Sequence, residues 1–234
     1  ILLGGASVST AQNSLNGYFQ DAVQLAARTA FNMNESADIS LDMVAELTIA
    51  LETIANSGIA SAELVNKELN IHTFSYANTK SVQVYVDANA NWVQKLLENK
   101  NNIEQSPLRD FAELYNLQVS KIENLEGIMM LTIESKTPKN MKYIANQISF
   151  VDDVIMVELP AQNGDGHDVK AKRINGGWMI SYIYKYQDCL SGCKKQCEWK
   201  FGVNSNEEVQ FMGLYGDIPN EFTDNPLVVM QSKN

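Results

Sequence analysis

Residues 117–159 read LQVSKIENLEGIMMLTIESKTPKNMKYIANQISFVDDVIMVEL. Residues 117–122 and 128–134 have the composition of strands, and Asn124 to Gly127 between them forms a turn. Thr137-Pro138 then starts a helix with an apolar face, and residues 151–159 form a last strand. This stretch therefore predicts a hairpin followed by a helix and a strand.

The preceding residues complete the pattern. Residues 81–87 alternate valines with polar side chains and predict a strand, and residues 89–98 have apolar side chains at helical spacing. Ser106-Pro107 starts another helix, which runs to about Tyr115. The order is β-α-β-β-α-β, so we expect a ferredoxin-like unit with its helices on one face of a four-stranded antiparallel sheet.

The two flanking regions differ in character. Residues 18–69 show helical periodicity, whereas short β runs follow residue 166 and are joined by tight turns such as Asn175-Gly176-Gly177. The predicted fold class is α+β. Its expected parts are 1–11, the end of a signal sequence; 12–78, a helical segment; 79–160, the ferredoxin-like unit; and 161–234, an antiparallel β extension with an irregular tail.

Composition and the amino terminus restrict the class of protein. The chain has 234 residues, a formal net charge of −10 and 45% hydrophobic residues, which argues against nucleic-acid binding and against extensive disorder. No stretch is long and apolar enough to predict a membrane span. Residues 1–8 resemble the end of a secretory signal, and Ser9-Thr10-Ala11 supplies a cleavage site before Gln12. We therefore expect a secreted or periplasmic protein.

The three cysteines, Cys189, Cys193 and Cys197, lie four residues apart. A zinc site would need further ligands, and an iron–sulfur cluster would need another spacing, so neither a metal nor a cofactor is expected. In an exported protein, a Cys189 to Cys193 disulfide is favoured, with Gly192 permitting the turn. Cys197 could be buried, could compete for this bond, or could pair with another chain.

No catalytic residues are predicted. The chain has two histidines. His167 lies between Asp165 and Asp168 in a turn-rich stretch that predicts a linker, and His72 has no neighbouring acid or nucleophile in the sequence. Phosphate-binding loops, nucleophile elbows and zinc-protease helices are absent from the sequence, which lowers the expectation of an enzyme.

Aromatic side chains gather in the C-terminal β region, where they could form a recognition surface. Alternation puts the side chains of residues 178, 180, 182, 184 and 186 on one face of a strand. Packing of this face in a core is the favoured alternative. The candidate residues are Trp178, Tyr182, Tyr184, Tyr186 and Trp199.

The stretch from Gly166 to Tyr215 resembles a module of uncharacterised exported proteins of Bacteroidota, of the flavobacterial type. The resemblance rests on Trp178, the run Asp188-Cys189-x-Ser191-Gly192-Cys193, and Trp199 followed by another β strand. Weaker similarity extends upstream over residues 114–157, so about half of the chain is covered. The resemblance implies export and a Cys189 to Cys193 bond, and it implies no activity.

These observations favour an exported, non-enzymatic binding or structural accessory protein with an unknown protein or cell-surface partner. A propeptide-like protease inhibitor or chaperone is the alternative, with residues 159–162 as the inhibitory segment. A hydrolase with a scattered triad is a third hypothesis, and it would need a histidine beside a carboxylate and a Ser or Cys.

Overall fold

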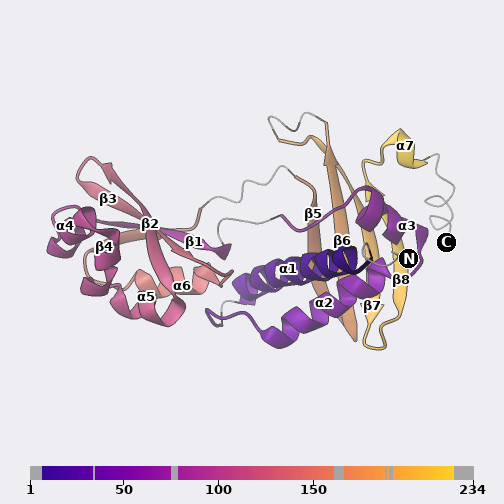
Figure 1. Ribbon diagram of the computed structural model, residues 1–234. Helices are drawn as coiled ribbons and strands as arrows, with labels where there is room; N and C mark the ends of the chain where they lie inside the picture. The colour runs from indigo at the N-terminus through magenta and orange to yellow at the C-terminus, as the bar shows by residue number, and fades with distance from the viewer. Residues whose placement is uncertain are drawn as a thin grey trace, which may run out of the picture. The chain divides into compact units, whose positions relative to one another are not determined.

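The computed structural model describes residues 7–33, 35–74, 79–160, 166–187, 189 and 192–223 (Figure 1). The protein mixes helices with two antiparallel sheets and divides into two compact units. Unit 1 comprises residues 1–26, 40–74 and 164–234, and unit 2 comprises residues 27–39 and 75–163. The first helix, α1 (Ser7–Met33), contributes residues to both units.

Unit 2 contains residues 117–159, the stretch that predicts a hairpin, a helix and a strand. Its elements are β1 (Ser81–Asp87), α4 (Asn91–Glu98), the 3-10 helix η3 (Lys100–Gln105), α5 (Arg109–Tyr115), β2 (Leu117–Leu125), β3 (Ile128–Ser135), α6 (Met141–Ile148) and β4 (Val154–Glu158). The strands form one antiparallel sheet in the order β2-β3-β1-β4. Glu126 and Gly127, both with positive φ, join β2 to β3, as expected for a two-residue hairpin turn.

The core of unit 2 lies between this sheet and its helices. Val82, Val84 and Val86 alternate along β1 and are fully buried, and they belong to one cluster with Leu96 of α4 and Ile144 of α6. In Figure 1, α5 and α6 lie below the strands. One face of the sheet is thus covered by helices because alternate strand residues are apolar.

A buried asparagine attaches residues 27–39 to unit 2. Asn140 is completely buried, and its side-chain nitrogen donates to the carbonyl oxygens of Ala30 at 2.8 Å and Ser36 at 2.9 Å. Its backbone N–H donates to Ala37 O at 3.0 Å, and its side-chain oxygen caps α6 by accepting from Tyr143 N at 3.3 Å. Because a buried amide must satisfy its hydrogen bonds, this side chain fixes the segment in place.

Unit 1 combines N-terminal helices with the C-terminal strands. Besides part of α1, it contains α2 (Leu41–Ala55), α3 (Ala60–Glu63), the π-helix η1 (Leu64–Glu68), β5 (Asp168–Ile174), β6 (Gly177–Tyr186), β7 (Lys195–Asn204), β8 (Val209–Gly216) and α7 (Asn220–Thr223). Its antiparallel sheet has the order β5-β6-β7-β8. The regions predicted as separate parts, 12–78 and 161–234, pack together here.

Glu46 links α2 to the sheet of unit 1. Its carboxylate accepts hydrogen bonds from both terminal nitrogens of Arg173 and from the indole nitrogen of Trp178 at 3.1 Å. The Arg173 guanidinium also lies 4.8 Å from the centroid of the Trp178 ring. This arrangement orients α2 across β5 and β6, since a two-pronged arginine–carboxylate pair fixes direction as well as distance.

The predicted cleavage site, linker and tail lie next to, or partly outside, the residues that the structure describes. Helix α1 is continuous from Ser7, so its backbone includes Ser9 to Ala11, the predicted cleavage site. The tail that was expected to be irregular contains the short helix α7, and residues 163–165, half of the predicted linker 163–168, lie outside the described residues. Among the described helices, none is long and apolar enough to cross a membrane.

We predict that Gly177→Ala destabilises unit 1 by at least about 2 kcal/mol, because a Cβ there would lie 1.9 Å from Val203 O. Gly202→Ala is the control, since its Cβ would lie in ordinary contact with the Met212 side chain, 3.5 Å from Sδ and 3.9 Å from Cγ. It should shift stability by less than about 1 kcal/mol. Urea unfolding followed by tryptophan fluorescence in a Trp92→Phe background reports unit 1 alone. Equal effects of the two substitutions would contradict the prediction.

Candidate functional site

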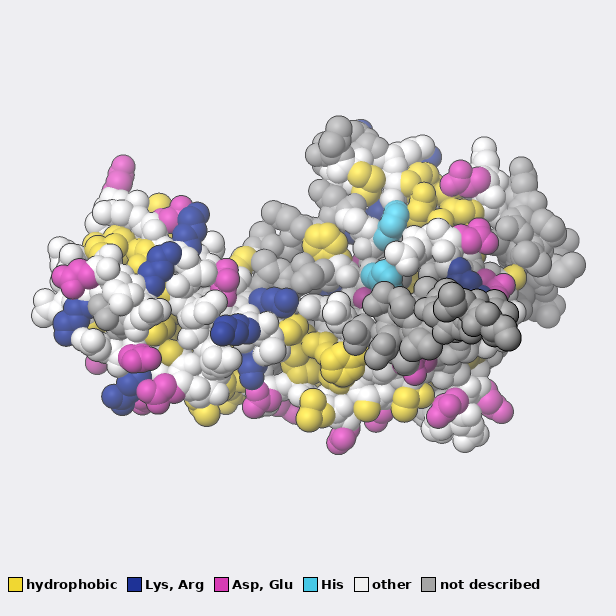
Figure 2. Space-filling view, viewed as in Figure 1, with side chains coloured by type: hydrophobic (Ala, Val, Ile, Leu, Met, Phe, Trp, Pro, Cys, Tyr) yellow, Lys and Arg dark blue, Asp and Glu magenta, His cyan; other side chains and the backbone are white. Residues whose placement is uncertain are grey.

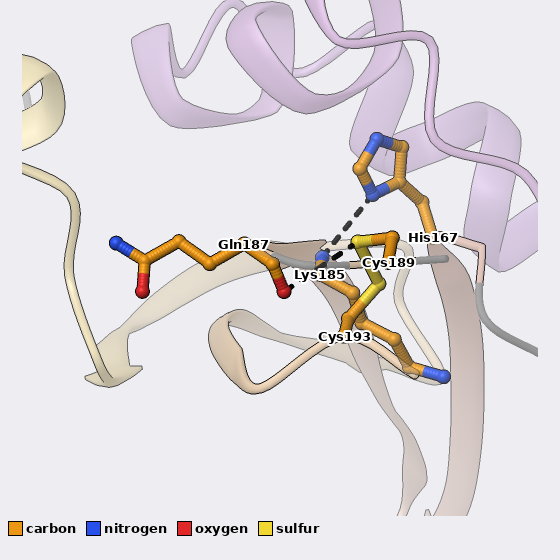
Figure 3. Close-up of a disulfide and its surroundings, with 5 residues drawn as sticks. All are labelled: His167, Lys185, Gln187, Cys189 and Cys193. Carbon is orange, nitrogen blue, oxygen red and sulfur yellow. Dashed lines mark hydrogen bonds between the residues drawn. A yellow bond between two sulfur atoms is a disulfide. The ribbon is translucent and has the colours of Figure 1, made fainter. Parts of the chain in front are cut away.

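The first feature of the candidate site is the disulfide loop between β6 and β7. Cys189 and Cys193 form a disulfide (Figure 3). Gln187, in the left-handed region with φ 61°, accepts a hydrogen bond at its carbonyl oxygen from Lys194 N at 3.0 Å. This bond closes the loop, and Gly192 has a positive φ of 99°, as the predicted turn requires.

Cys197 is the free cysteine, and it is buried in the core of unit 1. It lies opposite Tyr184 in the pairing of β6 with β7. Burial, together with the negative charges of Asp217 and Glu221, raises the pKa of its thiol to about 12. Since the thiolate is the reactive form, Cys197 is a packing residue in this structure.

Three of the five aromatic candidates are core residues. Trp178, Tyr182 and Trp199 are 4%, 1% and 0% exposed, so they offer no surface for recognition. Helical side chains account for the burial of the two on β6: Glu46 of α2 bonds Trp178, and Asn66 of η1 accepts from the Tyr182 hydroxyl at 3.4 Å. The remaining two, Tyr184 and Tyr186, are half-buried at the end of β6.

The two half-buried tyrosines form a stack with His167. The His167 and Tyr184 rings are parallel with centroids 4.4 Å apart, and Tyr184 and Tyr186 follow at 5.9 Å. Phe222 of α7 meets Tyr184 edge-on at 5.6 Å. We call His167, Tyr184 and Tyr186 the aromatic strip. It runs along β6 into the disulfide loop, so the predicted recognition surface is reduced to this end of the strand.

A hydrogen bond from a backbone N–H of β6 fixes the His167 ring on the aromatic strip. Its Nδ1 accepts a hydrogen bond from Lys185 N at 3.2 Å, as Figure 3 shows. Burial, and then the charge of Lys185, lower the pKa of His167 below its ordinary value of 6.5. His167 is therefore neutral at physiological pH, with the proton on Nε2.

His72 has an acidic partner, Asp21, that lies 51 positions away in the sequence. Asp21 of α1, whose side chain is 7% exposed, places Oδ2 2.7 Å from His72 Nδ1. Asp21 Oδ1 also accepts from Thr73 N at 2.8 Å and from the Thr73 hydroxyl at 2.6 Å. The carboxylate thus holds two consecutive residues at the end of the helical region.

The second nitrogen of His72 is also occupied. Nε2 lies 3.2 Å from the side-chain oxygen of Asn70, a residue with φ 46°. Because both ring nitrogens face oxygen acceptors, this geometry suits the imidazolium ion, and the bond to Asp21 raises the pKa of His72 above 6.5. Both ring nitrogens of His72 are thus engaged by carboxylate and amide oxygens, and neither is engaged by a hydroxyl or thiol that it could activate as a base.

A second buried aspartate continues this arrangement. Asp168, 1% exposed at the start of β5, accepts from Phe74 N at 2.8 Å and from Val169 N at 2.9 Å. Residues 72–74 therefore lie beside residues 166–168, and both histidines of the chain appear on one face in Figure 2 (cyan). Asp168, expected to be a turn residue of a linker, is in fact part of the core of unit 1.

Unit 1 also contains a hollow of about 630 Å³ between the end of α2 and the β7–β8 turn. Its lining includes two acids and two hydroxyl residues: Ile49, Glu52, Thr53, Asn56, Ser57, Ile59, Glu207 and Val209. The Thr53 hydroxyl donates to Ile49 O and the Ser57 hydroxyl to Ile54 O. The lining includes neither histidine nor cysteine, so it offers no activated nucleophile.

Within the described parts of the chain, no group of three or more His, Cys, Asp or Glu side chains could hold a metal ion. The Asp21 and His72 pair is completed by Thr73 and Asn70, so its oxygen and nitrogen atoms are used in holding the chain. The Asp21–His72 pair thus holds the chain, and the aromatic strip is a half-buried group beside it.

We predict that stability of unit 1 decreases as the pH rises above His72's ordinary pKa of 6.5. A raised pKa in the folded state contributes stability that is complete below pH 6.5 and is lost as the pH rises through the folded-state value. Urea unfolding from about pH 5 to about pH 9 should show this slope, and His72→Gln should flatten it. His167→Gln is the control: its lowered pKa acts oppositely, costing stability as the pH falls below 6.5. An unchanged slope in His72→Gln would refute the contribution of the Asp21–His72 pair to stability.

We also predict the state of the thiols. Under denaturing conditions without reductant, one thiol should react with Ellman's reagent, and all three should react after reduction. In the native protein, reaction should be slow, because Cys197 is buried and its pKa is raised to about 12. Cys197→Ser should abolish the unreduced signal, whereas three thiols without reductant would exclude the disulfide.

Comparison with models of known protein families, with curated protein sequences and with solved structures gave no match to this chain. Its function is therefore inferred from its own side chains.

Proposed function

We propose that the protein is an exported, non-enzymatic binding protein that uses the aromatic strip to contact a protein or cell-surface partner. The observation that carries this proposal is the stack of His167, Tyr184 and Tyr186 beside the disulfide. Half-exposed aromatic rings held rigidly by their neighbours provide contact area at little entropic cost. The disulfide limits the motion of the adjoining loop in the same way.

The hydrogen bonds made by the two histidine rings support a non-enzymatic role. A general base needs a free ring nitrogen aimed at a hydroxyl or thiol. His72 is held between two oxygen acceptors, and His167 accepts a backbone hydrogen bond at Nδ1. The hydrolase hypothesis is accordingly the weaker one.

Export is supported by the disulfide. Such bonds persist in oxidising compartments and are rare in the cytosol. Together with the sequence features of the Bacteroidota module, this leads us to propose that the chain is a secreted or periplasmic member of that group. The cleavage site after Ala11 remains a prediction.

We further infer that unit 2 is of the ferredoxin-like class. The succession β1, α4, α5, β2, β3, α6, β4 and the antiparallel order β2-β3-β1-β4 support this inference. For a propeptide-like inhibitor, the inhibitory segment would begin at Leu159, which packs against the core of unit 2, while Ala161 and Gln162 lie outside the described residues. The binding role therefore has more support than the inhibitor.

The test combines an activity screen with a binding screen. Purified protein should leave chromogenic ester, peptide and glycoside substrates unchanged, and it should bind members of an array of glycans and peptides. The double variant Tyr184→Ser/Tyr186→Ser should lower the array signal about tenfold, because clustered aromatic contacts dominate binding energy. Tyr215→Ser is the matched control, since Tyr215 is a 47% exposed tyrosine on β8, outside the strip.

Two results would overturn the proposal. Turnover of a substrate that disappears in His72→Gln or His167→Gln would establish an enzyme. Array binding that survives unchanged in the Tyr184→Ser/Tyr186→Ser variant would exclude the aromatic strip as the contact surface.

A further inference from the structure

The described helices of unit 2 pack with its core cluster against one face of its sheet. The core cluster takes alternate residues from each central strand, such as Val82 and Val84 of β1 and Leu131 and Ile133 of β3. Strand alternation sends the intervening side chains to the other face. We call this side of the β2-β3-β1-β4 sheet the open face.

Apolar side chains form two rows on the open face. In the strand register, Tyr85 pairs with Met156 on one side and with Met130 on the other, so these three residues form a row across β4, β1 and β3. Ile128 lies two residues from Met130 and pairs with Leu125 of β2. Met156 is 44% exposed and Leu125 46% exposed, at opposite edges of the sheet. Together the rows make a contiguous apolar strip that is exposed at its two ends, whereas Met130 at its centre is 9% exposed. Apolar surface of this kind is typical of an interaction site.

Carboxylates surround these rows. Glu123 pairs with Met130 at the end of the first row, and Glu158 accepts a hydrogen bond from the Tyr85 hydroxyl at 3.1 Å. Burial raises the pKa of Tyr85, and so do its hydrogen bond to Glu158 and the charges of Glu158 and Glu123. Glu134 and Asp87 lie at the two ends of the β1–β3 pairing.

Little positive charge opposes these acids within the strands. Lys121 is the basic strand residue of this face, and it pairs with Glu123 at 2.8 Å. The described strands thus place four carboxylates and one lysine around an apolar centre. A surface of this composition attracts a cationic partner electrostatically and retains it through apolar contact.

We propose that the open face is a docking surface for a basic segment of another protein, in which lysine or arginine accompanies apolar residues. This inference rests on the proposed binding function and adds a second surface with its own partner chemistry. The apolar rows would receive the partner's apolar side chains, and Glu123, Glu134, Glu158 and Asp87 would face its cationic groups. The acidic rim also disfavours nucleic acid, whose phosphates it repels.

The test uses the full chain and a fluorescein-labelled peptide of alternating lysine and valine, with a glutamate and valine peptide for comparison. Fluorescence anisotropy should show binding of the basic peptide alone. Glu123→Gln/Glu158→Gln should weaken that binding about tenfold, whereas Glu98→Gln/Glu104→Gln, an equal charge change at exposed acids on the helical side, should change it less than about twofold. Met156→Ser should weaken it about threefold, and Leu114→Ser, at a 72% exposed residue of α5, should not.

Several outcomes would overturn this inference. Equal losses in the two charge pairs would show unspecific attraction to an acidic protein. Amide chemical-shift changes confined to α4, α5 and α6 would place the peptide on the wrong face. Self-association in sedimentation experiments that Met156→Ser abolishes would assign the open face to a second copy of this chain. In each case, array binding through the aromatic strip would stand, so failure here is distinguishable from failure of the proposed function.

Discussion

Two buried carboxylates, Asp21 and Asp168, fix the last residues before the chain leaves unit 1 beside the first residues after it returns. Asp21 holds His72 and Thr73, and Asp168 holds the N–H of Phe74. Residues 75–163, the larger part of unit 2, are thus inserted between two points that are fixed to each other. Because the ends of this insertion are joined within unit 1, the helices and strands of unit 1 can form one core despite the long separation in sequence.

Sequence periodicity predicted the elements of unit 2 because their partners are close along the chain. The hairpin turn at Gly127 and the valine alternation of β1 are local signals with local consequences. In unit 1, by contrast, Glu46 bonds Arg173 across 127 positions, and Asp21 bonds His72 across 51. Periodicity shows that one face of a helix or strand is apolar, but it does not show which other element packs on that face. The available sign of a buried role for Asp21 was its position as a charged residue next to Ala22, on the side of α1 that is buried.

The candidate site could likewise be predicted from the sequence only in part. Alternation correctly grouped the even-numbered aromatic residues of β6 on one side, but the sequence could not show where the covering helices end. Trp178 and Tyr182 lie under α2 and η1, where Glu46 and Asn66 bond them, and Tyr184 and Tyr186 lie farther along the strand. His167 joined this group unexpectedly, because its stacking on Tyr184 depends on the β5–β6 pairing that begins at Asp168. His167, which was assigned to a linker, is therefore part of the aromatic strip.

The two proposed surfaces differ in charge, and this difference determines what each can bind. Lys185, Lys194 and Lys195 surround the disulfide loop beside the aromatic strip, whereas Glu123 and Glu158 flank the open face. A basic segment drawn to the open face is repelled from the lysines, so one ligand type does not suit both surfaces. Each surface also belongs to a unit with its own sheet. On these proposals, the protein is an adaptor that selects two chemically different partners, and the overall charge of −10 understates the positive character of the disulfide region.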